Sequence, residues 1–390
     1  MKLDSITQII ELLCAAAACG SVGYYGVCLW GAVSFLRERG KAGKGDYPIQ
    51  LPPVSILKPL KGSDPEMYES FRSHCQQDYP EFEIVFGVSE TDDPAIAEVE
   101  RLRREFPSLP IRLVICEKRL GTNTKVSNLA QMVEFAQNEL LVVNDSDIRV
   151  QHDYLRHVVP GLSEPRVGMV TCLYRGVAVS TLGSRLEALG ISSDFSAGVL
   201  AARQLQGIRF GLGSTVAFRR TDLQAIGGFD SLADYLADDY ELGRRIADLE
   251  RTVNLSDTVV QTFLPAYSLR AFMQHQIRWA RTIRDVRPAG YAGLGITFGL
   301  IWAALTVVLS HGAWRAWGLL AAVAFMRAAM ALVVGRYVLG DAQVVRYLWL
   351  VPVRDLLAMG VWIASFAGHR VSWRGQWFTL KRGKLVRSPS

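Results

Sequence analysis

Residues 12–36 form one apolar run without a single charged side chain. A helix of this length can cross the roughly 30 Å hydrocarbon core of a bilayer. No small-residue cleavage site of the A-x-A type follows it, so the run predicts a retained membrane anchor rather than a removed signal peptide. The positive-inside rule then places the next part of the chain in the cytoplasm, because the anchor is followed directly by Arg37, Arg39, Lys41 and Lys44.

Three further apolar segments lie near the other end of the sequence, at residues 291–310, 316–335 and 347–368. The second carries Arg327, and the third carries Arg354 and Asp355 beside Pro352. An ionisable side chain at bilayer depth is costly and needs a partner. The third segment therefore either contains an intramembrane ion pair or breaks at Pro352 and lies in the interface.

Three full crossings would place the basic C-terminal tail outside, against the positive-inside rule. We therefore expect one of the three segments to be re-entrant or interfacial. The basic residues of this tail are Arg370, Arg374, Lys381, Arg382, Lys384 and Arg387.

The composition agrees with a membrane protein, because 50% of the residues are hydrophobic and the mean hydropathy is +0.17. Much of the net charge of +6 flanks the apolar segments, which favours anionic lipid head groups over nucleic acid as the partner. The six cysteines include no C-x-x-C pair. They indicate neither a zinc site nor a disulfide framework, as expected in a reducing cytoplasm.

The sequence divides into an anchor and basic linker (1–45), a cytoplasmic domain (46–288) and C-terminal membrane helices with the basic tail (289–390). In the middle part, strands predicted at 54–60, 82–89, 111–116 and 140–143 alternate with helices predicted at 64–77, 92–106 and 124–137. Asp64 is the expected cap of the first helix, and Asp93 before Pro94 suits the start of the second. This alternation predicts an α/β fold with a parallel sheet and helices on both faces.

Carboxylates follow two of these strands. Asp93 comes after the second strand, and Asp145 and Asp147 come directly after the fourth. Ligands of such sheets bind beyond the carboxyl ends of the strands. Two carboxylates this close repel each other, which favours a divalent metal between them, whereas the simpler alternative is a solvated polar turn.

Other nucleotide motifs are absent from the sequence. No G-x-G-x-x-G follows the first strand, and no G-x-x-x-x-G-K-[ST] occurs, which argues against a dinucleotide oxidoreductase and a P-loop phosphotransferase. The run RFGLGSTVAFRR (209–220) predicts a glycine-rich turn into a strand. Its small residues either admit an acceptor or simply close a tight turn.

Five sequence stretches together resemble the GT-A glycosyltransferases of the ceramide glucosyltransferase type. These stretches are DDPAI (92–96), GTNTKVSNL (121–129), NDSDIRV (144–150), ADDYELGRRI (237–246) and HQIRW (275–279). That group is glycosyltransferase family 21, which is related to the larger family 2. PPVSILKPLKG, TCLYRG, RLEALGI and HQIRWARTIR are more similar to the bacterial branch that makes glycosylated hopanoids.

The resemblance implies a GT-A, Rossmann-like fold and a role for each matching residue. It implies that Asp93 contacts the nucleotide base or ribose, and that Lys125 helps to hold the uridine diphosphate. Asp145 and Asp147 match the D-x-D element, in which the second carboxylate binds a divalent metal, magnesium or manganese, and the first supports the ribose or the metal. Asp239 matches the general base, which takes the proton of the acceptor hydroxyl in an inverting displacement.

The remaining matches lie on the acceptor side. Asp238 either caps the helix that begins there or acts directly. Arg278 suits a phosphate of the nucleotide sugar, and Trp279 suits a wall beside the acceptor. His275 departs from the glutamine or arginine usual at its position, and it either touches the acceptor or faces solvent.

Three functions stay open. The resemblance favours an integral protein of the bacterial inner membrane, with its catalytic domain on the cytoplasmic side, that moves N-acetylglucosamine from UDP-GlcNAc to a hopanoid polyol such as bacteriohopanetetrol. Glucose transfer from UDP-glucose to ceramide is the alternative within this class. The other two functions are a processive polysaccharide synthase, which His275 and the few membrane segments disfavour, and a noncatalytic membrane scaffold, which the intact carboxylates disfavour.

Overall fold

The computed structural model describes residues 2–42, 51–373 and 376–387 of the chain. Lys44, Arg374 and the boundary expected after residue 45 lie outside the described residues. By internal packing the chain divides into two compact units, each assembled from three stretches of sequence. The sheet unit comprises Arg39–Val179, Gly207–Pro265 and Gly383–Ser390, and the helical unit comprises Met1–Glu38, Ser180–Gln206 and Ala266–Arg382. The division of the chain at residues 45 and 288 remains a proposal.

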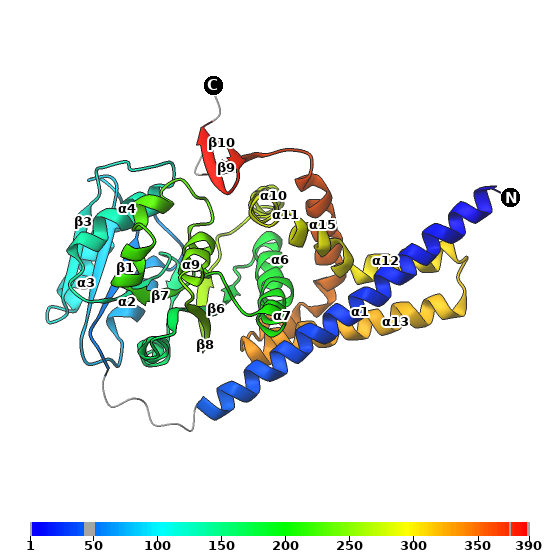
Figure 1. Cartoon of the computed structure of the whole chain (residues 1–390), viewed down its shortest axis with the longest axis horizontal. Coiled ribbons are helices and arrows are strands. Elements are labelled where there is room, and N and C mark those ends of the chain that lie inside the picture. Colours follow the sequence, from blue (N-terminus) through cyan, green and yellow to red (C-terminus); the bar gives the residue numbers. More distant parts are fainter. Residues whose placement is uncertain (1, 43–50, 374–375, 388–390) are drawn as a thin grey trace. The chain divides into compact units, whose positions relative to one another are not determined.

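The sheet unit contains one eight-stranded sheet (Figure 1). In spatial order its strands are β3 (Ile111–Ile115), β2 (Phe82–Val88), β1 (Val54–Pro59), β4 (Leu140–Val143), β7 (Val216–Arg219), β6 (Val167–Val177), β8 (Thr252–Phe263) and β5 (Ile148–Arg149). The first four are parallel to their neighbours, whereas β7 is antiparallel to both β4 and β6. The expectation of a parallel sheet is right for these four strands and for the neighbours β6 and β8, but β7 and β5 run antiparallel to their neighbours, so the sheet is mixed.

The helices of the sheet unit follow the predicted alternation, with differences in length and in one cap. They are α2 (Met67–Cys75), α3 (Ala95–Glu105), α4 (Thr124–Met132), α5 (Tyr154–Val158), α8 (Arg220–Ala225) and α9 (Asp238–Asp248), with short 3-10 helices η1 (Val133–Phe135), η2 (Val159–Ser163) and η4 (Phe229–Leu232). The unit also contains the short strand β11 (Lys384–Arg387). The helices predicted at 64–77, 92–106 and 124–137 are all shorter in the structure. Asp64 does not cap α2, because the N-cap residue is Glu66 and Asp64 instead accepts a hydrogen bond from Ser146.

Helices cover both faces of the parallel strands, as the sequence predicted. On one face Ile56 and Phe86 of the sheet belong to a buried cluster with Phe71 of α2 and Val99 of α3. On the other face α4 lies so close to β2 that a Cβ atom on Gly87 would come within 2.3 Å of the Met132 sulfur. The alternation of side chains along each strand thus gives both helix layers an apolar surface.

The helical unit contains the apolar segments. Its elements are α1 (Lys2–Ala42), α6 (Leu182–Gly190), η3 (Ile191–Phe195), α7 (Ser196–Gln206), α10 (Leu269–Val286), α11 (Pro288–Gly293), η5 (Leu294–Thr297), α12 (Gly299–Leu309), α13 (Trp314–Leu332), η6 (Val333–Val338), α14 (Gln343–Arg346), η7 (Leu348–Leu350), α15 (Val351–Ser365), β9 (Arg370–Trp373) and β10 (Gln376–Lys381). Strands β9 and β10 pair in an antiparallel hairpin. The stretch HQIRW lies within α10.

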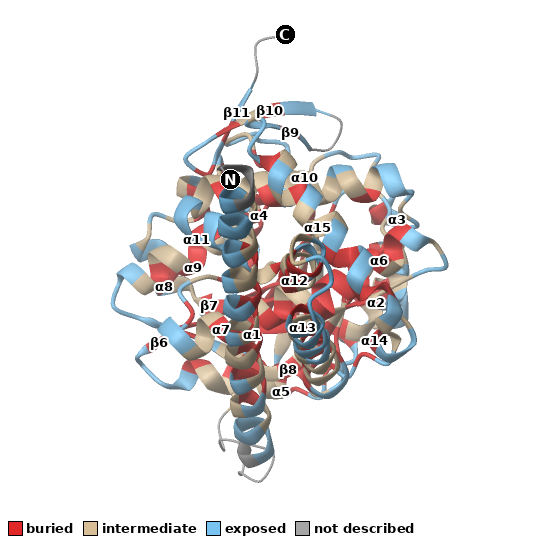
Figure 2. Ribbon diagram, turned by 90° about the vertical axis from the view of Figure 1, so that its right-hand side faces the viewer, coloured by how far each residue is buried: buried red, intermediate tan, exposed pale blue. Residues whose placement is uncertain are grey.

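Among the described residues, three helices are long and apolar enough to cross a membrane, at Ser5–Gly40, Trp314–Val338 and Leu348–Ser365. A fourth candidate, Pro288–Thr297 with Gly299–Leu309, is bent by 52° at its break and is either a broken span or a re-entrant loop. Much of α1 is exposed (Figure 2), and several of its exposed residues are large and apolar. These are Ile6, Ile9, Ile10, Leu12, Leu13, Trp30 and Val33. Such a face suits lipid tails rather than water.

The structure shows where the C-terminal apolar segments bend and which of their charged residues form an ion pair. The bend falls at Phe298 in the first apolar segment and not at Pro352, which occupies the first turn of α15, where proline is tolerated. The Arg327 guanidinium contacts Asp355 at 2.6 Å, and both side chains are buried. The third segment thus runs through Pro352 as one helix, and its Asp355 pairs with Arg327 of the second segment rather than with its neighbour Arg354.

Candidate active site

The Asp145 and Asp147 loop starts where β4 ends, beside the carboxyl end of β1. The two strands are parallel neighbours, with Leu57 opposite Val143. Lys58, the next residue of β1, is completely buried and donates a hydrogen bond from Nζ to the Asp145 carbonyl oxygen at 2.9 Å. Burial lowers the pKa of Lys58 to about 7, although the nearby carboxylates act in the opposite direction. The buried Lys58 side chain thus holds the backbone of the D-x-D loop in place.

Lys125 links two of the predicted carboxylates. It lies at the start of α4, and its Nζ is 2.7 Å from Asp145 Oδ1 and 3.2 Å from Asp238 Oδ2. The surrounding carboxylates raise the pKa of Lys125 against the opposing effect of burial, so it stays charged. In this structure Lys125 therefore joins the D-x-D loop to the start of α9.

Asp238 is the first residue of α9 and not its cap, because the N-cap residue is Ala237. The Asp238 carboxylate accepts a hydrogen bond from Asn123 Nδ2 in addition to its ion pair with Lys125. Of the two roles left open by the sequence, capping is thus not the one adopted. Asp238 instead supplies charge next to Asp239.

Asp239 and Asp145 approach each other around Gly213. A Cβ atom built on Gly213 would lie 3.1 Å from Asp145 Oδ2 and 3.2 Å from Asp239 Oδ2. Any side chain at this position would therefore fill the space that both carboxylates face. Burial and the neighbouring Asp238 raise the pKa of Asp239 to about 7, while Lys125 opposes the rise. A carboxyl group with a pKa near neutrality is suited to accept a proton.

Backbone and side-chain hydrogen bonds hold the glycine-rich loop between these carboxylates. Asn144, which is fully buried, donates from Nδ2 to the Ser214 carbonyl oxygen at 2.8 Å and to Thr215 Oγ1 at 3.0 Å. Gly211 N donates to the Asp239 carbonyl oxygen at 3.1 Å. The loop is thereby tied both to the D-x-D loop and to α9, which fixes the distance between the acidic groups.

The carboxylates present fit a divalent cation that also binds a diphosphate. Burial and the adjacent Asp145 raise the pKa of Asp147 to about 6, which is the expected cost of two close carboxylates. In the part of the chain that the structure describes, no group of three or more His, Cys, Asp or Glu side chains is arranged to hold a metal. Magnesium and manganese sites commonly combine one or two protein carboxylates with substrate phosphates, so the pair fits such an ion.

Asp93 is engaged with the backbone. Its carboxylate accepts hydrogen bonds from Gly62 N at 3.0 Å and from Ala95 N at 2.9 Å. It thereby supports the start of α3, as the sequence suggested, and also holds the loop after β1. Gly62 has a φ of 70°, a conformation that favours glycine. A nucleotide contact by Asp93 remains a proposal.

The other three predicted residues belong to α10 in the helical unit. His275 does not simply face solvent, because its Nδ1 lies 3.0 Å from the Tyr267 hydroxyl and its ring stacks on Trp279. Burial, together with the charge of Arg278, lowers the pKa of His275 to about 3, so the ring is neutral at physiological pH. Trp279 is partly exposed and meets the Phe195 ring edge-on.

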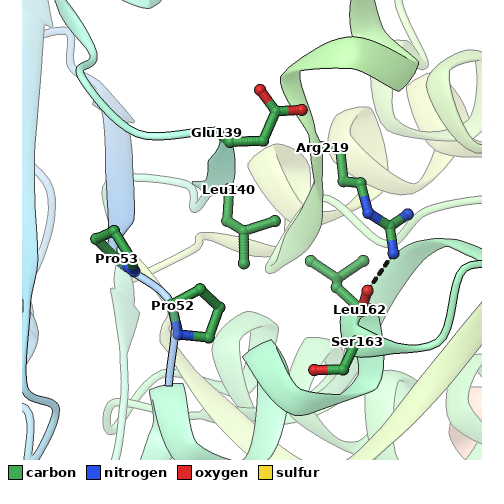
Figure 3. A pocket seen from close by; sticks show the side chains of 7 residues that line it. All are labelled: Pro52, Pro53, Glu139, Leu140, Leu162, Ser163 and Arg219. Carbon is green, nitrogen blue, oxygen red and sulfur yellow. Dashed lines mark hydrogen bonds between the residues drawn. The ribbon is translucent and has the colours of Figure 1, made fainter. Parts of the chain in front are cut away.

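The sheet unit also has a surface pocket away from the carboxylates described above (Figure 3). It has a volume of about 230 Å³ and lies at the amino ends of β1 and β4, whereas ligands of such sheets bind beyond the carboxyl ends. Arg219 in its wall already donates hydrogen bonds to Leu162 and Val167 and contacts Asp222. The Arg219 guanidinium of this pocket is thus already bonded to neighbouring residues of the fold.

Sequence reasoning missed Lys58, Asn144 and Gly213. Only Lys58 carried a usable signal, because it is a single charged residue at the end of an apolar strand. Asn144 stands beside the D-x-D element, but its partners come from a loop far away in the sequence. Nothing local distinguishes Gly213 from a turn glycine.

Comparisons with known proteins find ceramide glucosyltransferases among the similar sequences. The chain is 25% identical over 244 residues to Ceramide glucosyltransferase 3 of Caenorhabditis elegans, covering 59% of this chain and 50% of that protein. It is 31% identical over 158 residues to Ceramide glucosyltransferase of Komagataella phaffii, covering 40% of this chain and 31% of that protein. The chain thus spans about half the length, or less, of these curated relatives.

Among solved structures, a mannosyltransferase of Pyrobaculum calidifontis in complex with GDP-Man and Mn2+ matches with a TM-score of 0.52 at 21% identity. The match covers 90% of this chain and 98% of that one, and it shows that the fold is GT-A. The family model of glycosyl transferase family 21 matches residues 13–386, nearly the whole sequence. The chain therefore belongs to glycosyl transferase family 21.

Proposed function

We propose that this protein is a membrane-bound inverting glycosyltransferase that moves a sugar from a uridine diphosphate donor to a hydroxyl group of a membrane lipid. The observation that carries the proposal is the approach of Asp145 and Asp239 around Gly213. One carboxylate belongs to the proposed donor site and the other is the proposed base. A reacting sugar in the space between Asp145 and Asp239 would contact both carboxylates.

The reaction is a single displacement. Asp239 takes the proton of the acceptor hydroxyl while that oxygen attacks the anomeric carbon from the face opposite the diphosphate. The new carbon–oxygen bond forms as the bond to the diphosphate breaks, and uridine diphosphate leaves with the electron pair. No covalent intermediate with the protein is needed.

The other residues hold the donor. Asp145 and Asp147 would hold the divalent cation, magnesium or manganese, which when bound neutralises the charge that builds on the leaving diphosphate. Lys125 keeps the carboxylates of Asp145 and Asp238 in place. Asp93 contacts the nucleotide, and Arg278 contacts a phosphate.

The proposed acceptor is a hopanoid polyol, bacteriohopanetetrol, which receives N-acetylglucosamine from UDP-GlcNAc. Ceramide with UDP-glucose is the second candidate, and the names of the relatives in Caenorhabditis elegans and Komagataella phaffii favour it. Both acceptors keep an apolar body in the bilayer, which suits a chain whose described residues include three apolar helices of spanning length. The basic residues Arg37 and Arg39, which follow the apolar run within α1, support a catalytic region on the cytoplasmic side of a bacterial inner membrane.

The test is a mass spectrum of lipid extracts from a host supplied with both acceptors. The host expresses the wild-type chain, Asp239→Asn or Asp248→Asn, the last being an exposed aspartate of the same helix. A new hexosamine-bearing hopanoid made by the wild type and Asp248→Asn, but not by Asp239→Asn, is the expected result. A hexosylceramide would establish the second candidate.

The same preparations decide the remaining alternatives. Chelation of divalent metal in membranes should abolish transfer, and added manganese or magnesium should restore it. Polymer in place of glycolipid would indicate a processive synthase, and no transfer to any acceptor would indicate a scaffold. Near-normal turnover of Asp239→Asn would remove this residue as the base.

A further inference from the structure

Helix α6 of the helical unit presents a polar cluster that the proposed chemistry does not use. Gly183, Glu187 and Gly190 lie four and three residues apart and therefore share one face of the helix. A Cβ atom on Gly183 would come within 2.6 Å of the Tyr267 carbonyl oxygen, and one on Gly190 within 2.6 Å of Arg354 Nε. The two glycines let these neighbours approach the helix backbone on the face that carries Glu187.

Glu187 is buried and fixed at one oxygen only. Its Oε2 accepts a hydrogen bond from Gln276 Nε2 at 2.7 Å, and the Oε1 of Gln276 accepts one from Arg354 at 2.9 Å. The other carboxylate oxygen, Oε1, lies 4.0 Å from His275 Nε2. Hydrogen bonds between nitrogen and oxygen are about 2.7–3.2 Å long, so these two atoms face each other without bonding.

His275 is oriented toward this gap. A neutral imidazole carries one proton, and the Tyr267 hydroxyl can donate to Nδ1, 3.0 Å away. The proton then resides on Nε2, where the Glu187 carboxylate favours it. A donor and an acceptor thus stand 4.0 Å apart, and a hydroxyl oxygen about 2.8 Å from each would bond to both.

Arg354 supplies an independent observation. It is 7% exposed, and among the described residues its Nε and Nη1 atoms have no hydrogen-bond partner. Unsatisfied buried donors cost free energy, which an oxygen-rich ligand would recover. Its third nitrogen, Nη2, contacts Gln276 and lies 3.6 Å from Asp194.

We propose that Glu187 and His275 bind a hydroxyl group of the lipid acceptor, with Trp279 as the wall against which the carbon skeleton of the head group packs. This inference rests on the proposed function and names the acceptor class, an uncharged lipid with a hydroxylated head group. The Glu187 carboxylate repels an anionic head group, and the guanidinium groups of Arg278 and Arg354 repel a cationic one. Hydroxyl groups both donate and accept, which matches a site that offers a carboxylate and a ring N–H.

The experiment uses the full-length protein in detergent micelles, with bacteriohopanetetrol and ceramide as acceptors and with UDP-GlcNAc and UDP-glucose as donors. Glu187→Gln keeps the shape of the side chain and removes its charge. It should raise the KM for the acceptor about tenfold to a hundredfold, since hydrogen bonds to charged groups are worth this much. The KM for the donor and the hydrolysis of the donor without acceptor should stay at wild-type values.

Two further variants keep the test decisive. His275→Phe retains a ring that can stack on Trp279 but loses Nε2, and it should raise the acceptor KM in the same way even if Glu187→Gln folds poorly. Glu38→Gln is the matched control, because Glu38 is an exposed glutamate of the same unit that pairs with Arg203. It should leave both KM values unchanged.

The outcomes separate this inference from the proposed function. If the wild type transfers sugar and both variants keep its acceptor KM, the hydroxyl site is wrong while the function stands. If the wild type transfers sugar to neither lipid, the function is wrong and the site falls with it. An increase in acceptor KM without a change in donor KM supports both.

Discussion

Asp239 shows how one residue takes its chemistry from its neighbours. Burial and the adjacent Asp238 raise the pKa of Asp239 to about 7, and the nearby Lys125 limits the rise. As the proposed base, Asp239 must be deprotonated to act. The kcat/KM of the wild type should therefore increase as the pH rises through about 7.

The variant Asp238→Asn tests this electrostatic account. Removing the like charge lowers the pKa of Asp239, so the rising limb of kcat/KM should move to lower pH, whatever the height of the plateau. The measurement is a pH profile of transfer for the wild type, Asp238→Asn and Asp248→Asn. The last removes a more distant carboxylate of α9 and should keep the wild-type midpoint; an unshifted midpoint in Asp238→Asn would contradict the account.

At the scale of elements, the docking of α5 on β8 should depend on pH. His157 of α5 lies 3.0 Å from Asp257 of β8 and 3.3 Å from Asp153, and the hydrogen bond to Asp257 raises the pKa of His157 above 6.5. The folded protein thus holds this proton more tightly than the unfolded chain does. The resulting stabilisation is complete below about pH 6.5 and is lost as the pH rises through the raised pKa.

The check is thermal unfolding of detergent-solubilised protein between about pH 5.5 and 8.5. Asp257→Asn should lower the Tm at the acidic end and have a smaller effect at the basic end, because the histidine is neutral there. Asp248→Asn is the control, since Asp248 pairs with Arg209 and Arg244, which stay charged throughout. A Tm difference for Asp257→Asn that is independent of pH would exclude the His157 ion pair as its cause.

The packing of α1 makes a second prediction at this scale. A Cβ atom on Gly31 would lie 2.6 Å from the Leu200 carbonyl oxygen of α7, so the two helix backbones touch there. Gly31→Val should separate the helices and cost about 1–3 kcal/mol of stability. Gly26→Val on the same helix is the control, because nothing lies within 4 Å of its Cβ position. Equal Tm values for the two variants in detergent would disprove the close packing.

At the scale of the whole molecule, the sequence predicted those features that depend on residues close together in the chain. The apolar runs predicted the helices that are long and apolar enough to span a membrane, and alternating patterns predicted β1 to β4 with their crossover helices. The D-x-D element and Asp239 were recognised because their sequence neighbours are distinctive. Lys58 and Gly213 were not, because their roles depend on Asp145 and Asp239, far from them in the sequence.

The sequence also did not show which stretches of the chain combine to form each unit. Each unit combines three separate stretches of the chain. No periodicity of the sequence shows that residues 180–206 belong to the same unit as the long apolar helices. Local sequence patterns therefore predict single helices and strands. They do not predict which distant segments of the chain pack together.

The buried ion pair of the helical unit tests this assembly directly. Arg327 of α13 contacts Asp355 of α15 at 2.6 Å and Asp194 of η3 at 2.5 Å, so one guanidinium joins segments separated by more than a hundred residues. Arg327→Met leaves Asp355 buried without its partner and should cost about 3–5 kcal/mol of stability. The double variant Arg327→Met/Asp355→Leu removes both charges and should recover most of that loss, since apolar replacements of a buried pair are often neutral. Thermal unfolding of the single and double variants in detergent measures the coupling, and additive losses would mean that the pair does not hold these helices together.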